Sequence, residues 1–399
     1  RIALVKRILV GLILGAVLGI AVPQATGIAI LGDVFVSALK AIAPLLVFFL
    51  VISSLCNAGK SHGGVIKTVI ILYMFSTVLA AVIAVFASMA FPVKMTLANA
   101  ATDTSAPQGI VEVLNNLLLN VVANPVSSLV NANYVGILMW AVLLGLAFRA
   151  ADKMTKKVLA DVADGISMVV TWIINLAPFG IFGLVFNTVS TNGLDIFTTY
   201  GKLLVLLVGC MLFIYFVTNP ILVYWCIRQN PYPLIFHCLK RSALTAFFTR
   251  SSAANIPVNM KVCEEMGLDR DTYSVTIPLG ATINMDGAAI TITVMTMATA
   301  FTLGIHVDIP TAIILSLLAA LSACGASGVA GGSLLLIPMA CSLFGISDDI
   351  SMQVVAVGFI IGVVQDSVET ALNSSSDLLL SASAEFRQWR LEGKEIKFK

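Results

Sequence analysis

Long runs of apolar residues, separated by short polar segments, dominate the pattern along this chain. A membrane-spanning helix needs about 20 consecutive apolar residues, and several runs reach that length. The runs do not alternate with polar residues, which favours helices over a β-barrel. We expect spans at 7–23, 33–57, 65–92, 110–148 (broken by Asn124-Pro125 and Asn131-Ala132-Asn133), 157–190 and 196–228, and less regular apolar segments at 232–262, 271–303, 310–346 and 350–384.

Three of the later segments are interrupted by polar or small residues. The interruptions are Thr249-Arg250-Ser251-Ser252, TINMDG at 282–287 and CGASGVAGGS at 324–333. The first and third lie between two half-length apolar arms, as in re-entrant hairpins. Non-helical backbone at membrane depth persists only where it is buried in protein or lines a wet cavity, and broken helices point to the site of a transporter. The alternative is a glycine-rich kink that allows close helix packing.

This pattern predicts an all-α membrane protein with eight transmembrane helices and two re-entrant helical hairpins. Cytoplasmic loops of membrane proteins are rich in Lys and Arg. Only Lys94 and Lys202 lie on one predicted side of the membrane. The other side carries Lys6, Arg7, Lys60, Lys67, Arg149, Lys153, Lys156, Lys157, Arg228, Lys240, Arg241, Lys261, Arg270 and the basic tail from Arg387. We therefore expect a multi-pass protein of a bacterial inner membrane with both termini in the cytoplasm.

Composition supports a lipid environment. Hydrophobic residues make up 59% of the 399 residues and charged residues 11%, whereas soluble domains carry about 25% charged residues. The net charge of +2, with basic residues at segment edges, gives no indication of nucleic-acid binding. The seven cysteines include no C-x-x-C pair, and we interpret those in apolar runs as small core residues instead of metal ligands or disulfides.

Carboxylates, not basic residues, characterise the last third of the chain. Residues 271–386 contain no Lys or Arg, yet Asp286, Asp366, Glu369 and Asp377 fall within expected membrane segments. A carboxylate at the centre of a spanning helix costs at least about 2.5–3.5 kcal/mol. Bound cations, a substrate ammonium, protons or Arg250 would supply the missing positive charge. The alternative is that these are buried, protonated acids with a structural role.

Four polar residues form a stripe on the last expected span. Thr370, Asn373 and Asp377 follow Asp366 by 4, 7 and 11 positions, which places all three within about 40° of Asp366 around a helix. An amino acid's ammonium suits Asp366, and its carboxylate suits donors from Thr370 and Asn373. Asp377 is then available for a cation, since hard cations without redox chemistry take oxygen ligands.

Four motifs in order carry a family resemblance. The chain resembles the glutamate-transporter-like family of dicarboxylate/amino acid:cation symporters, and within it the bacterial sodium:serine/threonine symporters. TRSSAANIPV at 249–258, IPLGATINMDGAA at 277–289, GASGVAGGS at 325–333 and QDSVETALNSSSD at 365–377 resemble the family's hairpin 1, seventh span, hairpin 2 and eighth span. Order and spacing match over nearly the whole chain.

The resemblance implies an elevator-type transporter and a homotrimer. Residues 1–64 and 93–195 would form the scaffold, 65–92 and 196–386 the moving transport domain, and 387–399 a cytoplasmic tail. The substrate would lie between Arg250-Ser251-Ser252 and the region of Val329, with Asp366, Thr370 and Asn373 binding its backbone.

The resemblance also implies three sodium sites. One would use Asp377 with carbonyls of Gly280, Asn284 and Asn373. A second would use Thr282 and carbonyls near Ala323, Cys324 and Ala326. A third would use Asp286 and Asn284 with Tyr73, Ser76 and Thr77, for which ordinary helix packing is the alternative.

Two departures from the family pattern bear on the substrate. Where members that carry acidic amino acids have an Arg one residue before Thr370, this chain has Glu369, and where they have a Thr after Asp-Gly it has Ala288. Two carboxylates repel each other in a low-dielectric site, which disfavours glutamate and aspartate as substrates. A substrate hydroxyl can hydrogen-bond Glu369, which favours serine and threonine over alanine. A lysine-like substrate could also pair with Glu369.

Other functional classes are disfavoured. A cation channel would repeat its acidic residues around an axis, whereas these are concentrated in one third of the chain. The sequence contains neither H-E-x-x-H nor a Gly-x-Ser-x-Gly motif with a suitable His, so we do not expect an enzyme. The leading prediction is sodium-coupled import of serine and threonine, with an alanine-like or cationic amino acid as the alternative substrate.

Overall fold

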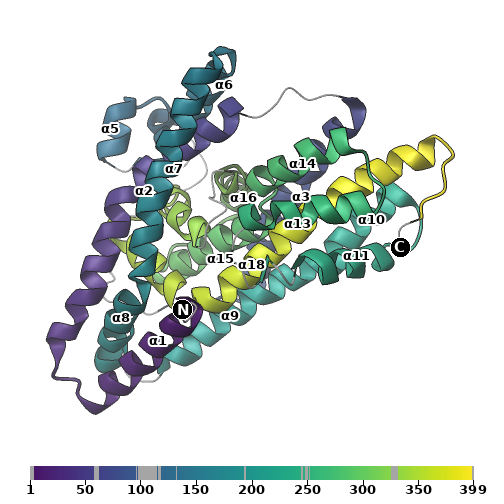
Figure 1. Ribbon diagram of the computed structural model, residues 1–399. Helices are drawn as coiled ribbons and strands as arrows, with labels where there is room; N and C mark the ends of the chain where they lie inside the picture. Colours follow the sequence, from purple (N-terminus) through teal and green to yellow (C-terminus); the bar gives the residue numbers. More distant parts are fainter. Residues whose placement is uncertain are drawn as a thin grey trace.

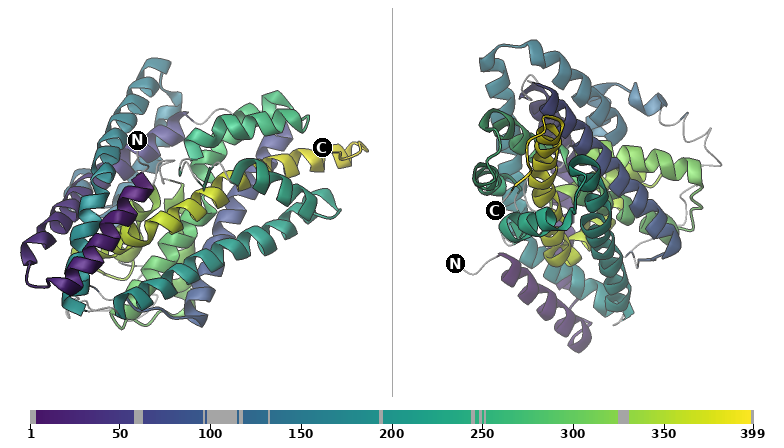
Figure 2. Two further views of the ribbon diagram at one scale, coloured as in Figure 1. Left: turned by 60° about the horizontal axis from the view of Figure 1, so that its bottom comes forward. Right: turned by 90° about the vertical axis from the view of Figure 1, so that its right-hand side faces the viewer.

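The computed structural model describes residues 4–57, 63–95, 97, 115, 118–131, 133–192, 195–243, 246–247, 250, 252–324 and 331–397. These residues form helices and connecting turns, and no strand occurs among them. The helices form two groups that lie side by side (Figures 1 and 2). The predicted all-α architecture is therefore confirmed for the described part of the chain.

The first group contains the N-terminal helices and those after the third span. It comprises α1 (Leu4–Ala21), α2 (Ala29–Asn57), α6 (Tyr134–Ala147), α7 (Lys153–Asn175) and α8 (Ala177–Asn192), with the short elements η1 (Thr26–Ile28), α5 (Pro125–Val130) and η2 (Phe148–Ala150). Within it α2 packs against α6, α7 and α8. The expected segment 157–190 is divided at Leu176, and the predicted breaks at Asn124 and Asn133 are confirmed, since each caps a new helix.

Glycines let α1 and α8 approach each other closely. A Cβ atom added to Gly11 would lie 2.4 Å from the carbonyl oxygen of Pro178, and one added to Gly15 would lie 2.6 Å from that of Phe182. Small residues at helix contacts are the usual means of packing within a membrane, because lipid offers no hydrophobic driving force between helices. The four-residue spacing of Gly11, Gly15 and Gly19 thus defines this contact face.

The second group surrounds the long C-terminal helix. It comprises α3 (Gly63–Ala90), the continuous run α9–η3–α10 (Asp195–Phe213, Ile214–Thr218 and Asn219–Ile227), α14 (Arg270–Ile283), α15 (Asp286–Thr302) and α18 (Asp348–Leu391). Helix α18, yellow in Figure 1, contacts α3, α9, α10, α13, α14 and α15. It bends by 83° between Gly362 and Val364, just before the acidic stripe. Glycine lowers the free-energy cost of such a departure from regular helix.

Two helix pairs flank α14 and α15. The first consists of α11 (Tyr232–Cys238) with η4 (Leu239–Ala243) and α13 (Ser252–Glu265), and the second of α16 (Ile309–Ala323) and η5–α17 (Gly332–Leu336 and Ile337–Ser342). These two pairs lie at the sequence positions of the expected hairpins, and we call them hairpin 1 and hairpin 2. Between α14 and α15 the helix is interrupted at Asn284 and Met285, which confirms the predicted break at TINMDG.

By length and composition, two described helices can cross a membrane as continuous spans, at Gly64–Ala90 and Tyr200–Ile227, and the bent pair within α18 could form a third. Several others are shorter apolar helices of 10–17 residues. Many large apolar side chains remain exposed on α1, α2, α7 and α9. Exposed apolar surface on this scale requires a lipid environment and not water.

Candidate functional site

The polar stripe of α18 is buried in the middle of the second group. Asp366, Thr370, Asn373 and Asp377 are 3%, 6%, 3% and 1% exposed, and Glu369 beside them is 5% exposed. Their contacts, described below, reach α15, the break between α14 and α15, and both hairpins, and they form a polar core along α18. Buried charges of this kind need compensation from ions, partners or hydrogen bonds.

Asp366 connects α18 to both hairpins. Arg250, which follows the first arm of hairpin 1, donates from Nε to Asp366 Oδ2 at 2.7 Å, and its Nη2 lies 2.6 Å from the same oxygen. The backbone N–H of Gly331 in hairpin 2 donates to Asp366 Oδ1 at 3.2 Å. Arg250 has a φ of +52°, a strained value for a residue with a side chain. Of the charge sources considered from sequence, the structure brings Arg250 to Asp366.

Glu369 is held by three donors from three elements. Its Oε2 atom accepts from Thr291 Oγ1 of α15 at 2.7 Å, from Ser333 Oγ of hairpin 2 at 2.9 Å and from Gln365 Nε2 of α18 at 2.5 Å. Gln365 Nε2 also donates to Thr291 Oγ1 at 2.8 Å. A carboxylate oxygen accepts such donors, so Oε2 is the hydrogen-bonded oxygen of this carboxyl group.

The N-terminus of α15 packs directly against Glu369. A Cβ atom added to Gly287 would lie 2.9 Å from Glu369 Cγ and 3.0 Å from its backbone oxygen. The Gly287 N–H donates to Asn373 Oδ1 at 2.7 Å, and Asn373 Nδ2 donates to the thioether of Met285 at 3.4 Å. Asn373 therefore satisfies the backbone freed by the helix break. The Thr370 hydroxyl donates to the carbonyl of Asp366 at 2.8 Å, within its own helix.

A second cluster surrounds Asp377. Asn284 Nδ2 donates to Asp377 Oδ1 at 2.9 Å, while Asn284 Oδ1 is buried without a hydrogen-bond partner among the described residues. A Cβ atom on Gly280 would lie 2.8 Å from the carboxylate of Asp377. The Tyr73 hydroxyl lies 2.9 Å from the carbonyl oxygen of Asp377 and 3.2 Å from that of Thr276.

A third cluster surrounds Asp286, the first residue of α15. Ser76 Oγ of α3 donates to Asp286 Oδ2 at 2.6 Å, and Thr77 Oγ1 lies 3.1 Å from Oδ1. The expectation from the family resemblance grouped Tyr73 with this acid. The Tyr73 hydroxyl contacts the carbonyl oxygens of Thr276 and Asp377, while the Thr77 hydroxyl lies 2.9 Å from the Tyr73 carbonyl oxygen one turn away on α3.

The remaining candidate residues lie at the hairpins. Ser252 begins α13 and is buried, and the thiol of Cys324 at the end of α16 lies 3.8 Å from the carbonyl oxygen of Ile283 at the end of α14. Ala323 is fully buried, while the Thr282 hydroxyl donates to its own helix at Leu279. Ser251, Ala326 and Val329 lie outside the described residues.

Sequence reasoning missed three members of the Glu369 cluster. Thr291, Ser333 and Gln365 were not among the candidates, although Gln365 lies four residues before Glu369 and therefore on the same helix face. Thr291 and Ser333 carried no comparable signal, since nothing in the sequence relates them to a residue 78 or 36 positions away.

Buried acids between interrupted helices, in an apolar chain with membrane-length spans, define a membrane transporter. Residues 4–385 match the model of the sodium:dicarboxylate symporter family, and the chain belongs to this family. Its membership identifies an integral membrane transporter and not an enzyme.

Relatives that match over nearly their whole length support the family membership. A protein of Bifidobacterium adolescentis named "Serine/threonine transporter SstT" is 58% identical over 395 residues, which cover 99% of this chain and 92% of the relative. Proteins with the same name from Streptococcus thermophilus and Streptococcus agalactiae are 55% identical over 391 residues and 58% identical over 386 residues. These matches cover 98% and 96% of this chain, and 97% and 96% of the respective relatives.

Proposed function

We propose that the protein imports serine and threonine together with sodium ions. The observation that carries the proposal is the charge of the site. Asp286, Asp366, Glu369 and Asp377 are buried, and Arg250 is the basic side chain that the structure places against them. With all four carboxyls ionised, they outweigh the Arg250 guanidinium by three negative charges, an excess that a zwitterionic substrate does not change. Co-transported cations would neutralise it. The names of the relatives support serine and threonine as substrates.

In this proposal the substrate ammonium binds Asp366. One oxygen of this carboxylate binds Arg250 of hairpin 1, and the other accepts from the Gly331 N–H of hairpin 2. An ammonium group would therefore join an existing ion pair that contacts both hairpins. Closure of hairpin 2 over the substrate would then depend on the same carboxylate that recognises it. Ser251, Ser252 and Val329 would line the same space.

The substrate carboxylate would receive donors from Asn373 and Thr370. The Asn373 Nδ2 group now donates to a thioether, a weak acceptor, so little is lost when it turns to a carboxylate. Thr370 would rotate away from the carbonyl of Asp366, which retains its helical partner. Thr370 lies about one turn and Asn373 about two turns along α18 from Asp366, on the same stripe of the helix.

The substrate hydroxyl would bind Glu369. Because Oε2 already accepts three hydrogen bonds, we assign the other carboxylate oxygen, Oε1, to the substrate hydroxyl. A site built to accept a hydroxyl proton rejects an analogue without that group, because a buried acceptor is then left unpaired. An acidic side chain would be repelled by the same carboxylate.

The sodium ions would bind at oxygen-rich positions around the helix break. Asp377 with the unpaired oxygen of Asn284 is one such set, together with carbonyls of Gly280 and Asn373. Asp286 with Ser76 and Thr77 is another. The end of α14 at Thr282 and the end of α16 at Ala323 and Cys324 would provide carbonyls for a third. Alkali cations favour such carboxylate, carbonyl and hydroxyl oxygens.

The two helix groups support an elevator mechanism. The first group would form the scaffold, residues 1–64 and 93–195, within a homotrimer, and the second group, residues 65–92 and 196–386, would carry the site across the membrane. Site residues lie on α3, α14, α15, α18 and the hairpins, which all belong to the second group. We place the protein in the bacterial inner membrane with both termini cytoplasmic, as the distribution of Lys and Arg favours.

Uptake of labelled serine into proteoliposomes tests the proposal. We expect uptake with an inward sodium gradient and its loss when choline replaces sodium. Unlabelled serine and threonine should compete strongly, alanine weakly, and aspartate and lysine not at all. Uptake that persists in choline would refute sodium coupling, and competition by lysine would favour the cationic alternative. Conductance in the absence of amino acid would favour a channel.

A further inference from the structure

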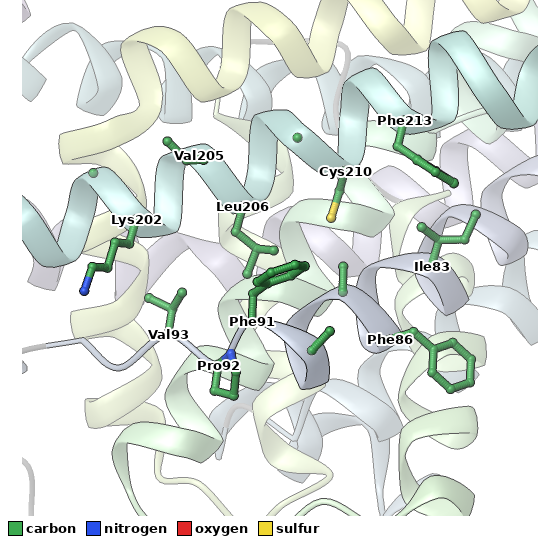
Figure 3. A pocket seen from close by; sticks show the side chains of 14 residues that line it. Ile83, Phe86, Phe91, Pro92, Val93, Lys202, Val205, Leu206, Cys210 and Phe213 are labelled. Atoms are coloured by element: carbon green, nitrogen blue, oxygen red, sulfur yellow. The ribbon is translucent and has the colours of Figure 1, made fainter.

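A groove of about 990 Å³ lies between α3 and α9, outside the site described above. Figure 3 shows its walls, with Phe86 of α3 and Phe91 just beyond the end of α3 on one side, and Val205 and Phe213 of α9 on the other. Its lining is almost entirely apolar, and Lys202 is the charged residue among those that line it. A volume of this size is at the upper end of pockets that hold small-molecule ligands, about 300–1,000 Å³.

The groove faces the lipid. Its two walls belong to Gly64–Ala90 and Tyr200–Ile227, the two continuous helices that are long and apolar enough to cross a membrane. Phe91 is 69% exposed and Val205 is 73% exposed. Such side chains on a spanning helix contact acyl chains and not water.

Glycines make the α9 wall concave. Gly201 and Gly209 lie two turns apart on the lining of the groove, on either side of Val205. A Cβ atom added to either glycine would meet nothing within 4 Å, so no other part of the described chain fills the space above them. These glycines differ from those of α1, which are covered by α8.

The length of the groove corresponds to one leaflet. Lys202 and Phe213 mark its two ends along α9, and eleven residues of helix rise about 16 Å. Half of the hydrocarbon core of a bilayer is about 15 Å. Farther along the same run, Tyr224 and Trp225 are half-exposed, as expected for aromatic residues at the opposite interface.

Positive charge lies at one end of the groove only. Lys202 is exposed there, and the exposed Lys94 follows Val93, which lines the same end. These are the two basic residues that the sequence predicts on the non-cytoplasmic side. Basic residues at a membrane surface attract anionic lipid headgroups.

We propose that this groove binds one anionic phospholipid, with an acyl chain between α3 and α9 and the phosphate at Lys202. An acyl chain matches the apolar lining and its one-leaflet length, and the headgroup matches the charge at the groove's end. The bound lipid would cover a face of the proposed transport domain that no described element covers. The lipid assignment does not depend on the proposed substrate.

Native mass spectrometry of the purified full-length protein in detergent tests this assignment. The protein is titrated with phosphatidylglycerol or with phosphatidylethanolamine of the same acyl chains. We expect one phosphatidylglycerol per chain to bind more tightly than phosphatidylethanolamine. Gly209→Leu, which fills the groove, should weaken binding of this lipid at least tenfold, and Gly201→Leu should act in the same direction. Lys202→Gln should weaken only phosphatidylglycerol, about fivefold.

Matched controls lie on α7, where Gly165 also has open space around it and Lys153 is exposed. Gly165→Leu and Lys153→Gln should bind lipid as the unchanged protein does. Unaltered phosphatidylglycerol binding in folded Gly209→Leu and Gly201→Leu would overturn the proposal, as would equal binding of the two lipids. A changed number of subunits with unaltered lipid binding would assign the groove to a contact between chains and also overturn it.

Discussion

Arg250 and Asp366 form a buried ion pair in which two guanidinium nitrogens, Nε and Nη2, lie 2.7 Å and 2.6 Å from a single carboxylate oxygen. The pair joins the end of the first arm of hairpin 1 to α18 across 116 positions of sequence. It places a buried guanidinium at the carboxylate to which we assign the substrate ammonium. A substitution of either residue should therefore change both the stability of the fold and the binding of substrate.

Removal of one partner of this pair should be strongly destabilising. Arg250→Gln leaves a buried carboxylate without its counter-ion, at a cost of about 3–5 kcal/mol. The double variant Arg250→Gln/Asp366→Asn removes both charges and should recover part of the thermal stability but no serine uptake. Thermal unfolding in detergent together with uptake by proteoliposomes checks both. Equal unfolding temperatures for the single and double variants would contradict the pairing argument.

Ser333 should contribute to selection of a hydroxyl substrate. Ser333→Ala removes one of the three donors to Glu369, worth about 1 kcal/mol for an ordinary hydrogen bond. We expect the preference for serine over alanine to fall about fivefold, since about 1.4 kcal/mol corresponds to tenfold. Competition of unlabelled serine and alanine against labelled threonine measures this ratio. Ser342→Ala in the same arm, whose hydroxyl bonds its own helix, serves as the control.

Glu369→Gln tests the carboxylate itself. An amide keeps nearly the same shape but has one strong acceptor fewer, and it conflicts with the donors that converge on Oε2. We expect loss of discrimination against alanine, with uptake of neutral amino acids reduced but present. Glu395→Gln in the exposed tail is the matched control. Selectivity identical to that of the unchanged protein would remove the main support for the hydroxyl assignment.

Ser76 should affect the sodium requirement more than any other property. Ser76→Ala removes a 2.6 Å hydrogen bond to the Asp286 carboxylate, an interaction with a charged group worth about 1.5–3 kcal/mol. The sodium concentration for half-maximal serine uptake should rise about tenfold or more. Ser88, farther along α3, is buried with no hydrogen-bond partner for its hydroxyl among described residues, so Ser88→Ala should leave that concentration unchanged. Equal sodium dependence of both variants would argue against an ion at Asp286.

Gly287 should tolerate no side chain. The methyl group of Gly287→Ala would lie 2.9 Å from Glu369 Cγ and 3.0 Å from the Glu369 backbone, and overpacking of this kind costs about 1–3 kcal/mol. We expect a lower unfolding temperature and little serine uptake. Gly165→Ala, in open space on α7, should be neutral or slightly stabilising. If Gly287→Ala takes up serine at the wild-type rate, the close contact between α15 and α18 is not required for substrate binding.

The apolar runs and low charge determined the lipid environment and the helical class, because each depends only on residues close together in sequence. The same is true of the α18 stripe and of the breaks at TINMDG and Asn133, where spacing and local capping suffice. The family resemblance also rested on motifs that can be read locally. The bend beside Gly362 and the division at Leu176 were not predicted, since packing determines where a long apolar run bends.

The partners of each buried acid were decided only by the tertiary structure. Tyr73 contacts backbone beside Asp377 across 304 positions, and Glu369 gathers donors from α15 and hairpin 2 that no spacing rule connects. By itself the sequence determined which acidic side chains lie at membrane depth and therefore need a neutralising partner. Their neighbours depend on how separate helices pack, because a buried charge is stabilised by whatever group folding brings within hydrogen-bond distance.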